Sequence, residues 1–111
     1  MFFLKFDKTM EEVKQALDEH QDIVLVDVRE ADEYASGHLP QAINMPLSRF
    51  HESYTMLPKE KPLYVYCRSG QRSRTAVKRL KDAGYANAYN IGGIIHWPYD
   101  TESVMICFIQ T

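Results

Sequence analysis

The stretch that decides the fold is Leu63-Tyr64-Val65-Tyr66-Cys67-Arg68-Ser69-Gly70-Gln71-Arg72-Ser73-Arg74-Thr75. It begins as a short apolar run rich in aromatic and β-branched residues, which predicts a strand that ends at Cys67. A polar loop with one glycine follows, and the apolar residues after Thr75 recur at helical spacing. The stretch therefore predicts a strand, a cysteine and the N-terminus of a helix, in that order.

This order has a chemical consequence for Cys67. Backbone N–H groups at the start of a helix lack intrahelical partners and lie at the positive end of the helix dipole, so they favour a thiolate over a thiol. Arg68 and Arg72 add positive charge to the same loop, which predicts an anion-binding site beside a nucleophilic sulfur. The alternative is a buried cysteine at the end of a core strand. The two arginines argue against it, because guanidinium groups are seldom buried without a partner.

Length and composition indicate one domain over residues 1–111, long enough for a single packed core. The formal net charge of −2 gives no reason to expect nucleic acid or a membrane as a partner, so anion binding must be local. No stretch has the length of a signal peptide core or a membrane span. The two cysteines form no disulfide framework, which predicts a cytoplasmic protein, and the scattered histidines predict no metal or cofactor.

The rest of the chain alternates between predicted helices and strands. Helices are predicted over residues 9–20, 31–36, 48–57 and 75–83, and strands over 23–26, 42–45, 63–67 and 88–91, with residues 2–6 as a candidate edge strand. Gly84 is expected to end the last helix in a left-handed conformation, and Gly92-Gly93 to form a tight turn. Such alternation over short loops predicts a parallel sheet with helices on both faces. The charged residues that start at Asp27 then lie where open α/β sheets build their sites.

From about Ile23 to Trp97 the chain resembles the rhodanese-like family of sulfurtransferases. Five segments carry the resemblance: Val26-Asp27-Val28-Arg29-Glu30, Glu33-Tyr34, Gly37-His38-Leu39-Pro40, Tyr66-Cys67-Arg68-Ser69-Gly70-Gln71-Arg72-Ser73, and Gly84-Tyr85 through Asn90-Ile91-Gly92-Gly93 to Trp97. The resemblance implies a rhodanese-like α/β fold with a central parallel sheet of about five strands between helical layers. Gln41, where the family often has glycine, and Ile91, where many members have an acidic residue, depart from the family pattern.

The resemblance also implies a chemistry. Cys67 would accept a sulfane sulfur atom as a persulfide from thiosulfate or a similar small anion, and would pass it to cyanide, a thiol or a protein cysteine. The anion would be bound by the loop residues Arg68, Ser69, Gly70, Gln71, Arg72 and Ser73, with Arg68 and Arg72 stabilising the departing sulfite. Asp27 and Arg29 are expected to support the site, with Arg29 paired to Glu33 or another carboxylate.

Several alternatives stay open. Arg68 or Arg72 could pair with a carboxylate instead of an anion. Cysteine phosphatases and arsenate reductases also use a thiolate between a strand and a helix, but they place an arginine six positions after the cysteine, where this chain has Ser73. A non-catalytic or redox-sensing rhodanese-like module would keep the same cysteine. The apolar tail at residues 103–109 needs cover, which predicts either a monomer that covers it or a homodimer, and Cys107 is expected to be an inert core residue or else a resolving thiol.

Overall fold

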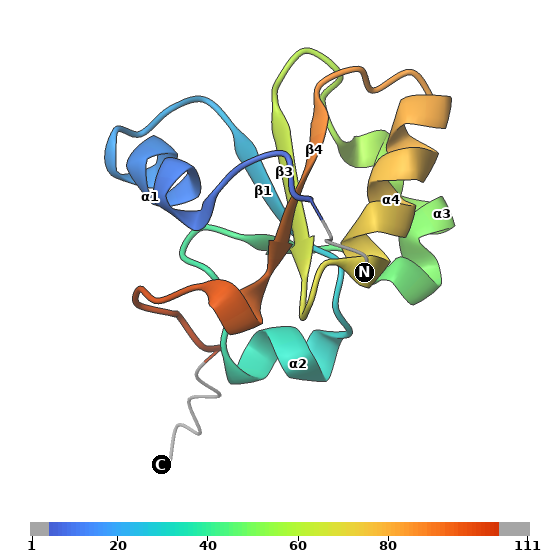
Figure 1. Ribbon diagram of the computed structural model, residues 1–111. Helices are drawn as coiled ribbons and strands as arrows, with labels where there is room; N and C mark the ends of the chain where they lie inside the picture. Colours follow the sequence, from blue (N-terminus) through green and yellow to red (C-terminus); the bar gives the residue numbers. More distant parts are fainter. Residues whose placement is uncertain (1–4, 105–111) are drawn as a thin grey trace, which may run out of the picture.

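The structure is a computed structural model that describes residues 5–104 (Figure 1). Four parallel strands in the order β2-β1-β3-β4 form its central sheet: β1 (Val24–Asp27), β2 (Ile43–Asn44), β3 (Leu63–Cys67) and β4 (Ala88–Gly93). The predicted parallel sheet is confirmed, although the described residues contain four strands rather than about five. The candidate edge strand at residues 2–6 lies mostly outside the described part, and its last two residues are not in a strand.

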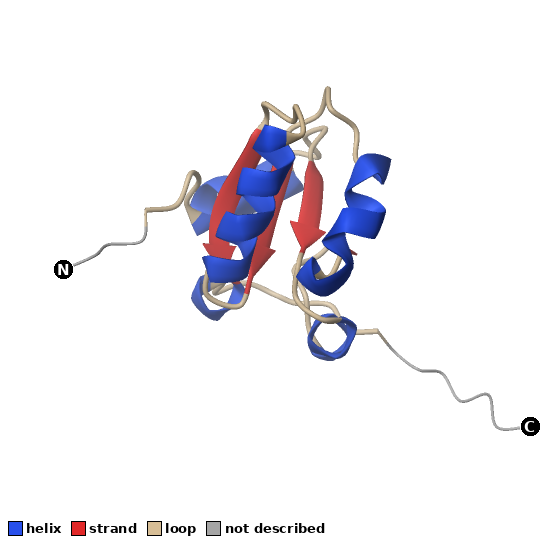
Figure 2. Cartoon of the chain, turned by 90° about the vertical axis from the view of Figure 1, so that its right-hand side faces the viewer, coloured by secondary structure: helices blue, strands red, loops and turns tan. Residues whose placement is uncertain are grey.

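Helices cover both faces of the sheet, as the alternating pattern predicts. The helix α1 (Met10–Asp18) lies on one face, and α3 (Phe50–Ser53) and α4 (Gln71–Asp82) lie on the other (Figures 1 and 2). The short helix α2 (Ala31–Ser36) lies across the carboxyl ends of the strands (Figure 1). No helix among residues 5–104 is long and apolar enough to cross a membrane.

The strand β3 shows how the sequence builds this core. All five of its residues are buried, because it lies between β1 and β4 with helices on both sides. Leu63, Val65 and Cys67 belong to the apolar cluster beneath α3 and α4, whereas Tyr64 and Tyr66 belong to the cluster beneath α1. This alternation follows from the two-residue period of a strand, and it turns the Cys67 side chain toward α4.

The segment predicted as one helix over residues 48–57 is broken. It contains a 3-10 turn at Leu47–Arg49, the single turn α3, and a second 3-10 turn at Tyr54–Met56. The Ser48 hydroxyl donates to Glu30 Oε1 at 2.8 Å instead of capping a helix. The Tyr85 hydroxyl lies 3.0 Å from the carbonyl oxygen of Tyr54 and 2.9 Å from that of Leu57. Contacts with distant residues therefore replace a continuous helical ladder.

The prediction of a tight turn at Gly92-Gly93 is wrong, because both glycines belong to β4. Tyr66 pairs with Gly92 and Cys67 with Gly93, after an irregularity in the register beside Val65. Gly92 has φ of 100°, a backbone conformation that glycine adopts without strain. The sheet therefore continues beside Cys67 to the end of β3.

After β4 the chain runs past α2 at the carboxyl edge of the sheet. His38 and Glu102 form an antiparallel bridge in which each N–H donates to the other residue's carbonyl oxygen at 2.8 Å. The N–H of Val104 donates to the carbonyl oxygen of Ala35 in α2 at 3.0 Å. These bonds fasten residues 102–104 to α2 and the turn that follows it. Most of the predicted apolar tail, including Cys107, lies outside the described residues.

Candidate active site

Cys67 lies at the last position of β3, where the chain leaves the sheet and turns into α4. Gly70 makes this turn possible, since it occupies the N-cap position of α4 with φ of 106°. Its N–H donates to Cys67 Sγ at 3.0 Å. Cys67 is only 1% exposed, so the sulfur is almost closed off from solvent in this conformation, although the N–H groups of the loop face it.

The environment of the sulfur favours the thiolate. Burial by itself raises the pKa of the Cys67 thiol, because a charge is poorly solvated there. Hydrogen bonds from Ser73 and from the N–H groups of Gly70 and Ser69 outweigh the burial and hold the pKa of Cys67 below its ordinary value. The predicted acidic thiol at a helix N-terminus thus has a geometric basis, even though the sulfur is buried.

Ser73 connects the sulfur to β4. Its hydroxyl lies 3.5 Å from Cys67 Sγ and 2.8 Å from Asn90 Oδ1, and a hydroxyl has one proton to donate. The amide of Asn90 is oriented by the carbonyl oxygen of Gly70, to which its Nδ2 donates at 3.1 Å, and by the N–H of Gly92, which donates to its Oδ1 at 3.0 Å. The Ser73 hydroxyl therefore shares its single proton between Asn90 and the sulfur, and the backbone N–H groups of the loop donate to the sulfur beside it.

The loop also lies directly against the backbone of β4. A Cβ atom placed on Gly93 would come within 2.0 Å of the carbonyl oxygen of Arg68 and within 2.6 Å of the Cα atom of Ser69. The same Arg68 carbonyl accepts a hydrogen bond from the N–H of Ile95 at 3.2 Å. The position of the loop relative to the sheet thus depends on the absence of a side chain at position 93.

Asp27 and Arg29 form a buried ion pair at the end of β1. Asp27 is fully buried and Arg29 is 6% exposed, and the distance from Arg29 Nη2 to Asp27 Oδ2 is 2.7 Å. Arg29 Nη2 also donates to the carbonyl oxygen of Gly37 at 2.6 Å, which ties α2 to the sheet. The carboxylate partner of Arg29 is thus Asp27 rather than Glu33, in an arrangement suited to the supporting role expected of both residues.

Glu33 instead pairs with Arg72. Arg72 Nη1 donates to Glu33 Oε1 at 2.7 Å and Nη2 donates to Glu33 Oε2 at 2.9 Å, across 39 positions of sequence. The pKa of Glu33 is lowered to about 2, mainly by the hydrogen bonds from Arg72, which outweigh the opposing effect of partial burial. The alternative of a carboxylate partner for Arg72 is therefore the arrangement that the structure shows.

The other loop side chains are exposed to different degrees. Arg68 and Gln71 are exposed, and Ser69 is half-buried. Gln71 lines a shallow cavity of about 540 Å³ on the outer side of α4, together with Arg74, Thr75 and Lys78. Ser69 and Gly70 contribute to the site through their backbone N–H groups.

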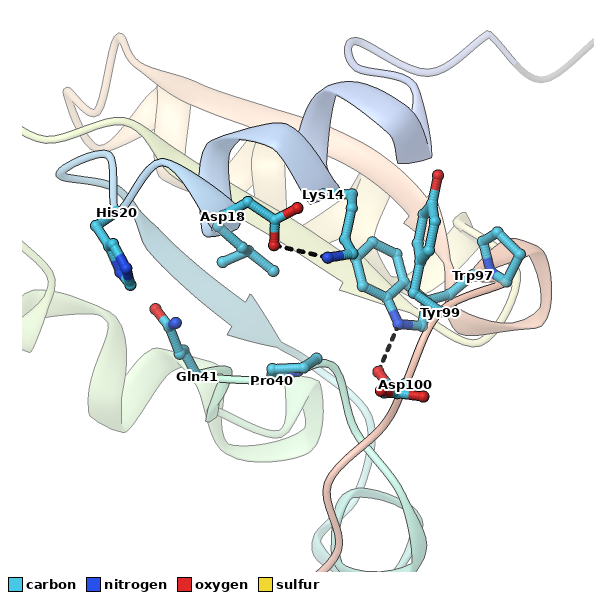
Figure 3. Close-up of a pocket in the computed structure, with 10 residues that line it drawn as sticks. Lys14, Asp18, His20, Pro40, Gln41, Trp97, Tyr99 and Asp100 are labelled. Carbon is cyan, nitrogen blue, oxygen red and sulfur yellow. Dashed lines mark hydrogen bonds and ion pairs between the residues drawn. The ribbon is translucent and has the colours of Figure 1, made fainter.

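A further cavity of about 520 Å³ lies between α1 and the segment that follows β4 (Figure 3). It is lined by Lys14, Leu17, Asp18, His20, Pro40, Gln41, Trp97, Pro98, Tyr99 and Asp100, none of which was predicted for the site. Gln41 has φ of 71° in the turn closed by the hydrogen bond from Ala42 N–H to the Leu39 carbonyl oxygen. Gln41, at a position where glycine is often found in proteins with this pattern, thus lies in a left-handed turn on the rim of this cavity.

The strand, loop and helix around Cys67 agree with a known family. A family model described as a rhodanese-like domain matches residues 9–98. The chain belongs to the rhodanese-like family. A rhodanese-like protein from Staphylococcus aureus has a similar structure, with a TM-score of 0.75 and 31% sequence identity over 86% of this chain and 94% of that one. The predicted rhodanese-like fold is therefore confirmed.

Relatives within this rhodanese-like family carry sulfurtransferase names. The thiosulfate sulfurtransferase GlpE of Coxiella burnetii is 35% identical over 78 residues, which cover 69% of this chain and 73% of that protein. The adenylyltransferase and sulfurtransferase Uba4 of Ogataea parapolymorpha is 47% identical over 75 residues, which cover 66% of this chain but 19% of that protein. The chain thus corresponds to most of the first relative and to a small part of the second.

Sequence reasoning missed two contributions to the site. It treated Asn90 only as part of a motif, although a buried asparagine in an otherwise apolar strand, beside a glycine, is a recognisable signal of a polar network. It also placed Glu33 beside Arg29, as one of two options with another carboxylate, and did not pair it with Arg72. The pairing with Arg72 depends on the placement of α2 across the strand ends, which local sequence does not reveal.

Proposed function

We propose that the protein is a sulfurtransferase that carries sulfane sulfur as a persulfide on Cys67. The observation that supports this most directly is the 3.0 Å hydrogen bond from the Gly70 N–H to Cys67 Sγ at the start of α4, together with the lowered pKa of the thiol. Family membership and the sulfurtransferase names of relatives point the same way. Thiosulfate is a candidate donor because one of these relatives is named for it.

In the first step the Cys67 thiolate attacks the outer sulfur of the donor. With thiosulfate, a bond forms between Cys67 Sγ and the outer sulfur, the bond from that sulfur to the sulfonate sulfur breaks, and sulfite leaves with the electron pair. The persulfide retains one negative charge, which the N–H groups of Gly70 and Ser69 stabilise. Because Cys67 is 1% exposed, the rim of the site must open enough to admit the donor sulfur.

In the second step a thiophilic acceptor attacks the outer sulfur of the persulfide and the Cys67 thiolate departs. Cyanide, a small thiol or a protein cysteine has the nucleophilicity that this step requires. No general base is needed, since the thiolate leaves and returns without a proton. The position six residues after Cys67, which holds an arginine in cysteine phosphatases, holds Ser73 with its hydroxyl bonded to Asn90, and this favours sulfur transfer over phosphoryl transfer.

The test is to incubate the protein with thiosulfate and to weigh it intact. We expect a gain of one sulfur atom that cyanide removes as thiocyanate, that is absent in Cys67→Ser and that remains in the matched control Cys107→Ser. A hydropersulfide donor is tested in parallel, so that the choice of donor is separated from the ability to form the persulfide. If neither donor adds sulfur to Cys67, the sulfur-transfer proposal fails and a binding or redox-sensing module is favoured.

A further inference from the structure

Arg72, in the first turn of α4, is already neutralised by a carboxylate. Both terminal nitrogens of Arg72 are bonded to Glu33, at 2.7 and 2.9 Å, and the pair is about two-thirds buried at the rim of the site. The pKa of Arg72 is raised, first by Glu33 and to a smaller extent by negative charge on Cys67. The Arg72 guanidinium is therefore bonded to the Glu33 carboxylate and also interacts electrostatically with the nucleophile.

The remaining charges at the rim do not restore a strongly cationic site. Glu30, which follows the end of β1, also interacts electrostatically with Arg72. Asp27 and Arg29 neutralise each other, which leaves Arg68 as an exposed charge on the loop. A site that seemed from the sequence to offer two arginines thus offers an anion little net positive charge from its side chains.

This charge balance discriminates between sulfur donors. When the Cys67 thiolate attacks thiosulfate, the transition state carries three negative charges. When it attacks a protonated hydropersulfide, R–S–SH, the transition state carries one. We propose that Glu33 is a specificity-determining residue that makes the site prefer hydropersulfides of small thiols over the thiosulfate dianion. This inference rests on the sulfur transfer proposed above and names its donor class.

Transfer of sulfur from a hydropersulfide to Cys67 requires no further reactant. A bond forms between Cys67 Sγ and the outer sulfur of R–S–SH, and the S–S bond of the donor breaks. The thiolate R–S⁻ leaves with the electron pair, and the proton stays on the outer sulfur of the new persulfide. The leaving group carries a single charge, so the step does not need a free arginine fork, in contrast to the departure of sulfite.

The experiment compares two variants of α2 with the unaltered protein. Glu33→Gln removes the charge and keeps the shape, and Asp32→Asn is the matched control, since it removes a charge from an exposed neighbour in the same helix turn. Single-turnover loading of Cys67 is measured with thiosulfate and with a small alkyl hydropersulfide. By Coulomb's law, removing one unit charge from the neighbourhood of a dianion, at a dielectric constant between that of a protein surface and that of bulk water, corresponds to about tenfold in the loading rate constant.

We expect Glu33→Gln to raise the second-order rate constant for thiosulfate about tenfold and that for the hydropersulfide less than about twofold, with Asp32→Asn close to the unaltered protein for both donors. An unchanged or lowered thiosulfate rate in Glu33→Gln overturns the proposal, because Glu33 would then only position Arg72. Should Glu33→Gln fail to fold, the unaltered protein decides the matter: a thiosulfate rate constant equal to or above that for the hydropersulfide overturns it. Persulfide formation that is equally fast from both donors refutes the selectivity and leaves the sulfur-transfer function standing.

Discussion

Replacing Gly93 by alanine should displace the loop around Cys67 without straining the strand that carries the substitution. The backbone at Gly93 has φ of −140° and ψ of 151°, which alanine adopts readily. Its new Cβ atom, however, would lie 2.0 Å from the Arg68 carbonyl oxygen, a contact that must open to at least 3.0 Å. The loop must therefore move by about 1 Å, and the hydrogen bond from the Ile95 N–H to the Arg68 carbonyl is lost or lengthened.

The magnitude follows from this displacement. Misplacement of a reacting group by about 1 Å costs on the order of 100-fold in rate, so we expect Gly93→Ala to lose sulfur transfer by about that factor. Forcing a methyl group into a packed contact costs about 1 to 3 kcal/mol of stability. The 3.0 Å bond from Gly70 N–H to Cys67 Sγ lengthens as the loop moves, which should raise the pKa of the thiol.

The assay is the rate of alkylation of Cys67 by iodoacetamide as a function of pH, in a Cys107→Ser background so that one thiol is observed. Thermal unfolding and sulfur transfer are measured on the same samples. The matched control is Gly37→Ala, whose Cβ atom would lie 3.8 Å from Thr101 Oγ1, an ordinary contact, on an extended backbone. If Gly93→Ala alkylates and transfers sulfur as the unaltered protein does, the dependence of the site on this close contact is refuted.

Three further predictions concern side chains of the site. Ser73→Ala should raise the pKa of Cys67 and lower its alkylation rate at pH 7 by more than about twofold, because the Ser73 side chain is the first of the hydrogen bonds that hold this pKa down; an unchanged rate would show that Asn90 holds the Ser73 proton and that the backbone N–H groups alone stabilise the thiolate. Asp27→Leu should lower the free energy of unfolding in urea by about 3 to 5 kcal/mol, because Arg29 is left buried and unpaired, whereas Asp27→Leu combined with Arg29→Met should lose less; an equal or larger loss in the double variant contradicts this. Hydrogen bonds from Arg72 are the main cause that lowers the pKa of Glu33 from 4.5 to about 2. Ionised Glu33 therefore stabilises the fold above pH 4.5, and this stabilisation is lost as the pH falls to about 2. The difference in unfolding free energy between the unaltered protein and Glu33→Gln should therefore shrink over that interval, and a difference independent of pH would contradict the pairing.

Elements with strong local signals were predicted well. The helix predicted from residue 9 begins with a capping box, in which Thr9 and Glu12 form reciprocal bonds of 2.9 and 3.1 Å. The helix of residues 31–36 has the predicted bounds, and Gly84 ends α4 with φ of 95°. In each case a few neighbouring residues specify the backbone, so a single sequence contains the necessary information.

The failures occur where distant residues decide the outcome. The helix α4 begins at Gln71, a full turn before the apolar spacing starts, because its first turn faces the sulfur and the Asn90 network rather than the core. A double glycine usually indicates a turn, but here Gly92 and Gly93 continue the strand, with the Phe6 ring packed against Gly92 and the loop after Cys67 packed against Gly93. The arrangement of charges at the rim, with Arg72 held by Glu33, likewise depends on packing between α2 and α4.

Glu102, which forms the bridge with His38, lies beyond the family match, which ends at residue 98. A shortened protein designed to that boundary would delete Glu102 and Val104, leaving the backbone groups of His38 and Ala35 to find water instead of their protein partners. Because α2 carries Glu33, such trimming would loosen the helix that sets the charge of the site. Fusions and expression boundaries for this protein are therefore better placed after residue 104.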